Sequence, residues 1–360
     1  MKIAFLGDVA LFGRFDIVNN PEVFEYFSEL KNTLNNVDYI VANLEAPFLN
    51  DGKKMGSKSA YLAAKKSNIE ILKFLGINAV SLANNHVFDY GLEGCQSTIE
   101  LLEENNIEWF GCAGKDLLID NNEKLVFHGY CSYDTNLLGA RKDNLPQGVN
   151  ILDVDDVKNK MKEYQEKGYF NFISVHSGIE HVNIPSLESI QFAHALSELM
   201  PYVYYGHHPH VMQGVENIND SVIAYSLGNF CFDDVIDDRT GQKLVELNED
   251  NKSSLILTVE LHEGKLVNSE KIGLYQGEDR YEVHSIKSEQ LLENYSDYLK
   301  LTNDELLKKR HEQISELYAK RNAVRNFKWL LSRLNFETIQ RRYELVRNAR
   351  LNKKHFLNKL

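Results

Sequence analysis

The sequence is poor in cysteine and has no long apolar run, and each absence excludes a class of protein. It has only 4 cysteines in 360 residues, and no two of them form a Cys-x-x-Cys pair. We therefore expect reduced core thiols rather than a disulfide framework or a zinc finger. No run of about 18 apolar residues occurs, so no segment is predicted to span a bilayer. The apolar stretch at the N-terminus is also too short for a signal peptide, which predicts a cytoplasmic protein.

Charge is divided unevenly along the chain. The formal net charge is −12, but residues 291–360 hold 16 Lys and Arg against 8 Asp and Glu, which leaves 24 against 44 in residues 1–290. An acidic body does not attract nucleic-acid phosphates, so no nucleic-acid partner is expected. The same acidity disfavours a polyanion as its ligand. The basic end could meet an anionic membrane, an anionic polymer or the body's own surface.

Short apolar runs typical of strands alternate with amphipathic runs typical of helices up to about residue 230. The predicted strands are Lys2–Leu6, Tyr39–Ala42, Ala79–Leu82, Phe172–Val175, Val203–Tyr205, Val222–Tyr225 and, later in the chain, Leu255–Leu261. The predicted helices are Pro21–Leu34, Ile69–Leu75, Gly94–Glu104, Val157–Lys167 and Leu187–Leu199. The polar segment 233–254 is predicted to be a loop or an insertion. This alternation predicts an α/β fold whose sheet is covered on both faces.

Glycine and proline are absent from Glu289 to Leu360, and the composition of this segment is helical, with breaks expected near Thr302 and Asn335. We therefore predict a body of residues 1–285 and a basic helical tail of residues 286–360. The tail helices are expected to pack on the body or on a second copy of the chain. A basic amphipathic helix can also lie on an anionic bilayer, which would place the protein at the inner face of the membrane. Its cations include Arg325, Lys328, Arg333, Arg341, Arg342, Arg347, Arg350, Lys353 and Lys354.

Residues able to bind a metal follow strand after strand. Five predicted strands lead in turn to Asp8, to Asn43 and Glu45, to Asn85 and His86, to His176, and to His207, His208 and His210. In open α/β sheets, side chains at the carboxyl ends of the strands leave the core and converge in one crevice. A mixed oxygen and imidazole set without thiolate suits zinc, manganese or iron. A carboxylate between two cations about 3.5–4 Å apart could bridge them, and such a pair activates water.

Each of these residues also has a plain structural explanation. The acidic and amide residues could cap a helix or lie in surface turns. His176, at the end of an apolar strand, could be a satisfied core histidine. Three imidazoles in the four positions 207–210, directly after a strand, are hard to explain by packing. Together with the shared sheet edge, they favour a metal site.

These motifs also carry a family resemblance. They are Gly7-Asp8, Asn43-Leu44-Glu45, Ala83-Asn84-Asn85-His86 with Asp89 and Gly91, His176-Ser177-Gly178 with Glu180, Gly206-His207-His208-Pro209-His210, and Tyr225-Ser226-Leu227-Gly228-Asn229-Phe230. In this order they resemble the capsule-biosynthesis CapA family over about residues 1–280. That family is similar in fold to the calcineurin-like metallophosphoesterases. The resemblance implies a layered α/β/β/α sandwich, here with a C-terminal helical extension, and a role in making a capsule or surface polymer such as poly-γ-glutamate.

The resemblance also implies roles for individual residues. The metal ligands that it implies, for one or two divalent ions (Mn, Zn or Fe), are Asp8, Glu45, Asn85, His176, His208 and His210. It makes His86 the general acid. Arg14 would hold an anionic substrate group or be a solvated loop residue. The supporting residues are Asn43, Asp89, Glu180, His207 and Asn229. Of these, His207 could replace His208 as a ligand, and Asn229 could instead only shape a turn.

Two positions depart from the phosphoesterase pattern. These enzymes usually begin Asp-x-His, but position 10 is Ala10, and the bridging position carries Glu45 instead of aspartate. Both changes favour one tightly bound metal or a different hydrolytic chemistry. Three hypotheses remain. The first is a hydrolase of capsule or surface-polymer biosynthesis, which acts on a phosphoester or an amide in an anionic polymer or in its phosphorylated precursor. The second is a non-catalytic assembly factor that retains the fold, and the third is a general metallophosphodiesterase.

Overall fold

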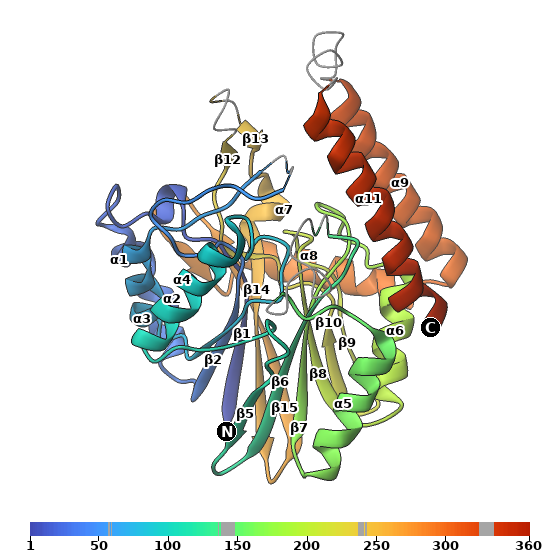
Figure 1. The fold of residues 1–360 in the computed structure, drawn as a ribbon. Coiled ribbons are helices and arrows are strands. Elements are labelled where there is room, and N and C mark those ends of the chain that lie inside the picture. Colours follow the sequence, from blue (N-terminus) through green and yellow to red (C-terminus); the bar gives the residue numbers. More distant parts are fainter. Residues whose placement is uncertain are drawn as a thin grey trace.

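The structure is a computed structural model, which describes residues 1–56, 58, 60–135, 137, 148–236, 241, 243–323 and 335–360. Two β-sheets pack face to face, with helices on the outer side of each (Figure 1). Two long helices, α9 and α11, extend beyond the edge of the sandwich. The predicted α/β/β/α sandwich and its C-terminal helical extension are therefore confirmed.

The sheets differ in how their strands run. The first has the order β16-β15-β14-β1-β2-β3-β4, in which β1 to β4 are parallel, β14 is antiparallel to β1, and β11 pairs with β1 beside it. Its strands are β1 (Lys2–Val9), β2 (Tyr39–Leu44), β3 (Ala79–Ser81), β4 (Glu108–Phe110), β11 (Asn229–Cys231), β14 (Ser253–His262), β15 (Lys265–Gln276) and β16 (Tyr281–Val283). The second has the order β5-β6-β7-β8-β10-β9, with β6, β7, β8 and β10 parallel. Its strands are β5 (Leu117–Asp120), β6 (Lys124–Cys131), β7 (Phe170–His176), β8 (Tyr202–His207), β9 (Val215–Ile218) and β10 (Ser221–Ala224).

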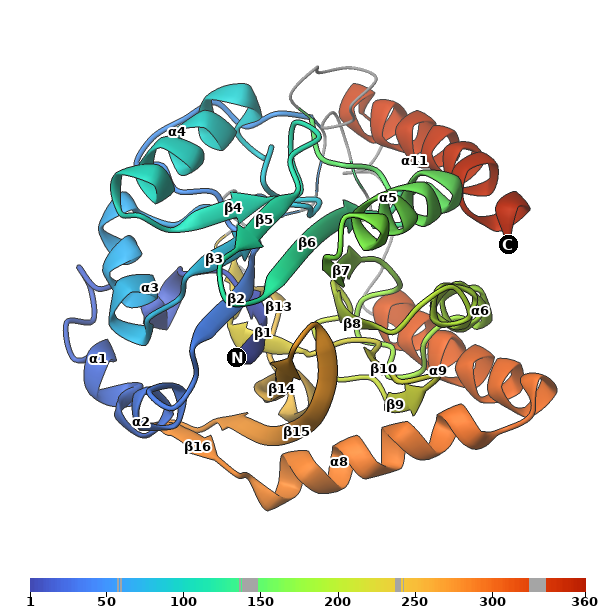
Figure 2. The same ribbon diagram turned by 90° about the horizontal axis from the view of Figure 1, so that it is seen from below.

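Helices cover both outer faces of the sandwich (Figure 2). The first sheet is covered by α1 (Val23–Tyr26), α2 (Ser28–Leu34), α3 (Ile69–Leu75) and α4 (Gly91–Glu104). The second is covered by α5 (Val154–Glu166) and α6 (Leu187–Ser197). The remaining helices are α7 (Glu249–Lys252), α8 (Ile286–Asp297), α9 (Asn303–Ala323) and α11 (Phe336–His355), with 3-10 turns at Gly13–Phe15, Lys66–Asn68, Tyr298–Lys300 and Leu357–Lys359.

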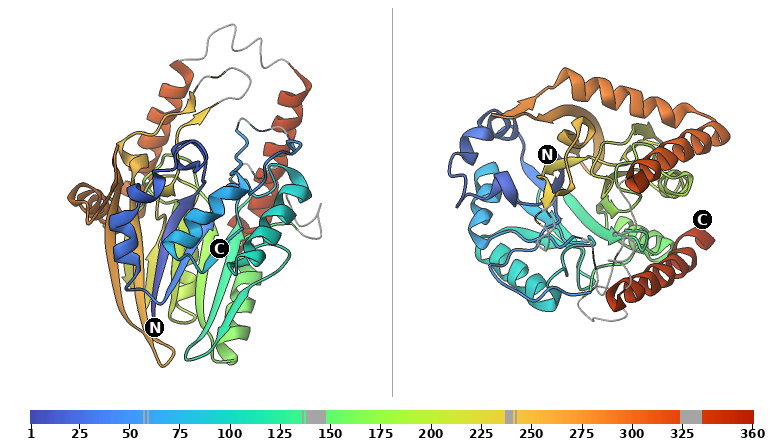
Figure 3. Two further views of the ribbon diagram at one scale, coloured as in Figure 1. Left: turned by 90° about the vertical axis from the view of Figure 1, so that its left-hand side faces the viewer. Right: turned by 90° about the horizontal axis from the view of Figure 1, so that it is seen from above.

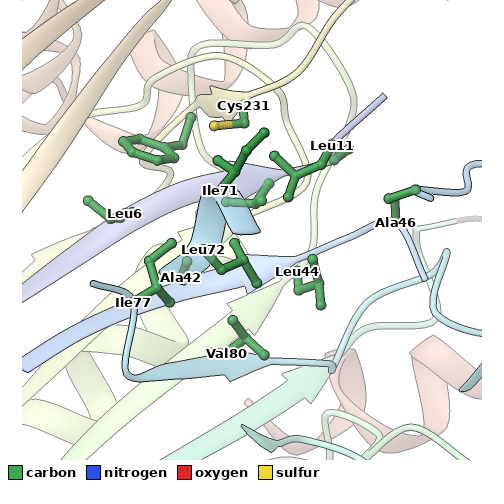
Figure 4. Close-up of a cluster of buried hydrophobic side chains, with 14 of the residues drawn as sticks. Leu6, Leu11, Ala42, Leu44, Ala46, Ile71, Leu72, Ile77, Val80 and Cys231 are labelled. Atoms are coloured by element: carbon green, nitrogen blue, oxygen red, sulfur yellow. The ribbon is translucent and has the colours of Figure 1, made fainter. Parts of the chain in front are cut away.

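Strand β1 shows why the apolar runs are nearly continuous. Its residues alternate between two cores, because successive side chains of a strand point to opposite faces. Phe5 faces the second sheet, where its ring centroid lies 4.3 Å from that of Tyr205 and 5.3 Å from that of Phe172. Leu6 faces the helices, in the cluster that Figure 4 shows between strands β1 to β3 and α3. A strand buried on both faces needs apolar residues at every position.

Several predicted elements differ from the structure. The predicted helix Pro21–Leu34 is divided into α1 and α2, and segment 233–254 contains the hairpin β12 (Val235–Ile236) and β13 (Lys243–Val245) as well as α7. The strands that were not predicted are β4, β5, β6, β9, β11, β12, β13, β15 and β16. In β15 the first half is largely exposed and polar, and in β6 His128 and Gly129 interrupt the apolar run, so neither segment has the pattern of a buried strand.

The C-terminal segment packs on the body through several polar contacts. Helices α9 and α11 begin directly after Thr302 and Asn335, the two positions where breaks were predicted. Each of these residues caps its helix: Thr302 Oγ1 accepts from Glu305 N at 3.4 Å, and Asn335 Oδ1 accepts from Thr338 N at 2.9 Å. In α11, Asn348 Nδ2 donates to Leu137 O at 2.6 Å. Figure 3 shows α9 and α11 rising separately from the sandwich. Among the helices that the structure describes, none has both the length and the apolar character needed to cross a bilayer.

Candidate metal centre

The predicted metal-binding residues meet at one edge of the sandwich, at the carboxyl ends of its parallel strands. Asp8 lies near the end of β1, Glu45 directly follows β2, and His176 and His207 are the last residues of β7 and β8. All four are at most 1% exposed. The register pairs Asp8 with Asn43 across β1 and β2, and His176 with His207 across β7 and β8. Parallel pairing within each sheet and the packing of the two sheets together bring residues up to 200 positions apart in the sequence into one crevice.

Close backbone packing and an unusual backbone conformation shape the histidine-rich segment after β8. A Cβ atom on Gly206 would lie 1.9 Å from the backbone oxygen of Tyr225, so only glycine fits there. The backbone φ angles of His208 and His210 are 96° and 57°, in the left-handed region that residues other than glycine rarely adopt. Such conformations cost about 1–3 kcal/mol each and cluster at functional sites. The two imidazoles are thus held in place by the surrounding fold.

Three residues form the arrangement best suited to a metal ion. The ligand atoms of Glu45, His208 and His210 all lie within 4.8 Å of one another. Both carboxylate oxygens of Glu45, and Nδ1 of His208, are buried and have no hydrogen-bond partner among the described residues. Burying a carboxylate without a partner is unfavourable, whereas a divalent cation would satisfy it. Oxygen and imidazole donors without thiolate fit zinc, manganese or iron, so the residues present fit the implied metal.

Asp8 is held from both sides by residues of the crevice. Its Oδ1 accepts from Asn43 Nδ2 at 2.8 Å and lies 3.0 Å from His207 Nδ1. Its Oδ2 lies 3.4 Å from His210 Nδ1. Burial raises the pKa of Asp8, but the hydrogen bonds and charges of His207 and His210 outweigh burial and hold this pKa well below its usual value. Ala10 is fully buried and offers no ligand atom, and the imidazoles beside Asp8 come from His207, the last residue of β8, and from His210, which follows that strand.

Buried charge shifts the pKa values of the crevice in opposite directions. Burial raises the pKa of Glu45 to about 8 and lowers that of His208 to about 3. Burial also lowers the pKa of His210, but the carboxylates of Glu45 and Asp8 outweigh it and raise this pKa to about 10. Asn229 Oδ1 lies 3.0 Å from His210 Nδ1, which gives Asn229 a place in orienting this ring.

Asn85 and His176 form a second group beside Glu45. The Nε2 atom of His176 lies 2.9 Å from Asn85 Oδ1 and 3.7 Å from Glu45 Oε1. The rings of His176 and His208 have centroids 4.8 Å apart. Burial and the neighbouring His208 hold the pKa of His176 well below its usual value, which favours the neutral imidazole that metals bind. All six predicted ligands are therefore adjacent in space.

A buried ion pair between Asp89 and Lys58 holds His86 in place. Asp89 was predicted from the sequence to support the site, whereas Lys58 was not. The Nδ1 atom of His86 lies 2.6 Å from Asp89 Oδ2, which also accepts from Leu62 N at 2.8 Å. Lys58 forms an ion pair with Asp89, and its Nζ donates to Asn85 O at 2.6 Å. The Lys58 side chain is 5% exposed. Nothing in the sequence indicates this role, because a single lysine in a polar loop has no distinguishing spacing.

The structure does not place Arg14 with the other predicted residues. Its backbone N donates to Asp233 Oδ2 at 2.7 Å and its Nε to Asp233 Oδ1 at 3.3 Å. Arg14 lines a different cavity, beside Tyr26 and Glu278. Its role toward a substrate stays a prediction. Glu180, by contrast, lines the cavity of the metal centre, and its Oε2 lies 3.2 Å from Arg321 Nη2 of α9.

A small cavity of about 50 Å³ reaches the candidate centre at one of its six ligands, His210. Its polar side is formed by His86, Glu180, His181, His210 and Asn229. Its apolar side is formed by Ala60, Leu62, Phe232, Val235, Val245 and Leu247, several of them in the segment predicted to be a loop. A buried water needs roughly 10–15 Å³ of such space, so the cavity has room for a few water-sized groups.

His181 and Asn251 also support the centre and were not singled out in the sequence. The side chain of Asn251 donates to His210 O at 2.8 Å, and its Nδ2 lies 2.9 Å from His181 Nδ1. Asn229 Nδ2 in turn donates to Asn251 O at 3.1 Å. In the sequence, only the concentration of histidines between positions 176 and 210 could have indicated His181, and nothing could have indicated Asn251.

Comparison with known proteins identifies similar sequences and structures. The family model of the bacterial capsule synthesis protein PGA_cap matches residues 2–234. Capsule biosynthesis protein CapA of Bacillus anthracis is 29% identical over 65% of this chain and 60% of its own length. PGA biosynthesis protein CapA of Bacillus subtilis is 29% identical over 65% of this chain and 63% of its own length. A probable polyglutamine synthesis accessory protein of Mycobacterium tuberculosis is 27% identical over 60% of each chain.

The chain thus spans about 60% of the length of the Bacillus relatives that it matches. Among solved structures, a hypothetical protein from Thermus thermophilus has a TM-score of 0.46 at 14% identity, covering 77% of this chain and 100% of that one. The sulfate thiohydrolase SoxB of Thermus thermophilus, in complex with glycerol, has a TM-score of 0.42 at 10% identity, covering 76% of this chain and 45% of that one.

Proposed function

The chain belongs to the bacterial capsule synthesis protein family, and from this premise we propose that it is a metal-dependent hydrolase of capsule or surface-polymer biosynthesis. The proposed reaction is attack by water on a phosphoester or an amide. The proposed substrate is an anionic polymer of the poly-γ-glutamate kind or its phosphorylated precursor. One relative bears a name that refers to PGA biosynthesis, which supports this class of substrate, and the name of another refers to polyglutamine, a related but uncharged polymer.

The observation that carries the proposal is the buried carboxylate of Glu45. Neither of its oxygens has a hydrogen-bond partner among the described residues, and two imidazoles share its surroundings within 4.8 Å. Without a cation, Glu45 would have to take up a proton to stay buried, as the raised pKa of its carboxyl indicates, whereas a metal ion would satisfy both oxygens in the ionised form. Glu45, His208 and His210 would hold the cation, with Asp8, Asn85 and His176 beside them. A divalent cation in this place lowers the pKa of water and stabilises the charge that develops on a substrate oxygen.

The residues around the ligands supply the remaining functions of a hydrolase. Asp89 occupies Nδ1 of His86 at 2.6 Å, which leaves Nε2 as the nitrogen that can hold a proton for a leaving group in the cavity. Lys58 compensates the charge of Asp89, so that the imidazole is oriented without being locked in its charged form. The apolar wall of the cavity excludes bulk water, which strengthens electrostatic interactions within it.

Metal analysis and a hydrolysis assay test the proposal together. We expect the full-length protein, purified without chelator, to hold Mn, Zn or Fe, and Glu45→Gln to lose it. With metal added, the protein should hydrolyse either a phosphodiester probe or a γ-glutamyl amide probe. His86→Ala should abolish hydrolysis and retain the metal, because His86 is assigned to proton transfer and not to metal binding. Glu260→Gln makes the same substitution beside Lys2, at the other end of β1 from Asp8, so it serves as the matched control and should change neither.

Two results would contradict the proposal. Purified protein that neither holds nor binds a divalent metal removes the proposed centre. Protein that binds metal at Glu45 but hydrolyses neither probe favours the non-catalytic assembly factor, for which Ala10 in place of a usual ligand is the supporting observation.

A further inference from the structure

Helix α11 carries an exposed apolar stripe that the proposed hydrolase does not use. Phe336, Ile339, Tyr343 and Val346 are 78%, 67%, 67% and 51% exposed. They follow one another at steps of three, four and three residues, a spacing that places them on one face of a helix. Scattered single apolar residues on a surface are ordinary, but a continuous stripe of four large ones is typical of a binding surface.

Cations accompany the stripe, and acidic residues do not. Arg342, Arg350, Lys353 and Lys354 are also exposed, and helical spacing places them on or beside the same face. Glu344 stands four residues before Asn348, which is 2% exposed, so helical spacing places this acidic residue on the side that faces the body. The outward face, defined by the four apolar and four basic residues above, is therefore both apolar and positively charged.

The opposite side of α11 attaches the helix to the body and fixes which face points outward. Asn348 donates to Leu137 O, Asn352 Oδ1 accepts from Ser132 Oγ at 3.2 Å, and His355 Nδ1 lies 2.7 Å from Asp153 Oδ2. Phe356, just after the helix, packs on Phe192 of α6. Figure 1 shows that the other end of the helix, which carries the apolar stripe, extends beyond the sheet edge that holds the metal centre. Exposure along the stripe accordingly falls toward the body.

We propose that this outward face of α11 binds the surface of an anionic lipid bilayer. The apolar side chains would enter the boundary between headgroups and acyl chains, while the cations would meet anionic headgroups. Charge complementarity favours a bilayer over a second copy of this chain, because the outward face of a symmetric partner would bring cations against cations. The binding surface lies on the same side of the molecule as the metal centre, so that the centre would act close to the membrane.

Co-sedimentation of the full-length protein with lipid vesicles tests the proposal. We expect binding to vesicles of phosphatidylcholine with phosphatidylglycerol, weaker binding to phosphatidylcholine alone, and a loss of binding as salt screens the charges. Ile339→Glu with Tyr343→Glu should lower the partition coefficient by about tenfold or more. Arg350→Gln with Lys354→Gln should lower it about fivefold for each cation removed. Circular dichroism checks that each variant is folded.

A matched control uses apolar residues that are equally exposed elsewhere on the body. Val18 and Val267 are 62% and 59% exposed, so Val18→Glu with Val267→Glu introduces the same charge change away from α11. This control should bind vesicles as the parent protein does. Equal losses in both double variants, or no vesicle binding by the parent protein, would overturn the proposal. So would a dimer in light scattering without lipid that Ile339→Glu with Tyr343→Glu dissociates, since the face would then bind a second copy.

Discussion

Replacing Lys58 by methionine tests the buried charged pair beside His86 most directly. The Asp89 side chain is 1% exposed, and although burial raises its pKa, His86 and Lys58 together hold this pKa below its usual value. Removing one partner of a buried ion pair typically costs about 3–5 kcal/mol, because the other charge remains in the interior. After Lys58→Met, Asp89 Oδ2 would still have His86 Nδ1 at 2.6 Å and Leu62 N at 2.8 Å. We therefore expect the lower end of that range, about 3 kcal/mol.

A second lysine provides the comparison for this measurement. Lys65 also forms an ion pair, with Asp16 at 2.8 Å, but its side chain is 45% exposed. Exposed pairs contribute about 0–1 kcal/mol, so Lys65→Met should lower the free energy of unfolding by no more than about 1 kcal/mol. Urea denaturation followed by tryptophan fluorescence measures both losses. Equal losses for Lys58→Met and Lys65→Met would refute the reasoning, because they would show that Lys58 is not compensating a buried charge.

Two further predictions concern the crevice itself. In metal-free protein the pKa of Glu45 is raised from 4.5 to about 8 by burial, and that of His210 from 6.5 to about 10, where the carboxylates outweigh burial. Both groups bind protons more tightly when folded, so the stability of the metal-free protein should fall as the pH rises from 6.5 toward 10, where His176 and His208 are neutral in both the folded and the unfolded state. Thermal melts in chelator measure this, and a profile that Glu45→Gln leaves unchanged would contradict it. Gly206→Ala should lower the free energy of unfolding, measured by urea denaturation, by about 1–3 kcal/mol or more, because the added Cβ would lie 1.9 Å from the backbone oxygen of Tyr225. An unchanged denaturation midpoint would contradict this prediction, because it would show that the Gly206 and Tyr225 segments can move apart freely.

Apolar runs separated by helical ones predicted an α/β sheet covered on both faces, and ligand-type residues at successive strand ends predicted one crevice. The family resemblance added the layered α/β/β/α arrangement and the set of six candidate ligands. The helix Ile69–Leu75 has the bounds that were predicted, since its apolar spacing is strong and Gly76, at φ 77°, ends it. Strands β6 and β15 were missed because their local patterns are broken by polar residues and glycine.

Local patterns therefore determined most of the elements that form the central strands and the edge of the sheet at which the candidate ligands lie, because strand and helix periodicity is set by neighbouring residues. Only the tertiary structure decided how side chains pair within that edge. Lys58 meets Asp89 across 31 positions, and Arg14 turns to Asp233 across 219. Contacts over such separations depend on how the two sheets and their loops pack, and residue spacing along the chain carries no record of that packing.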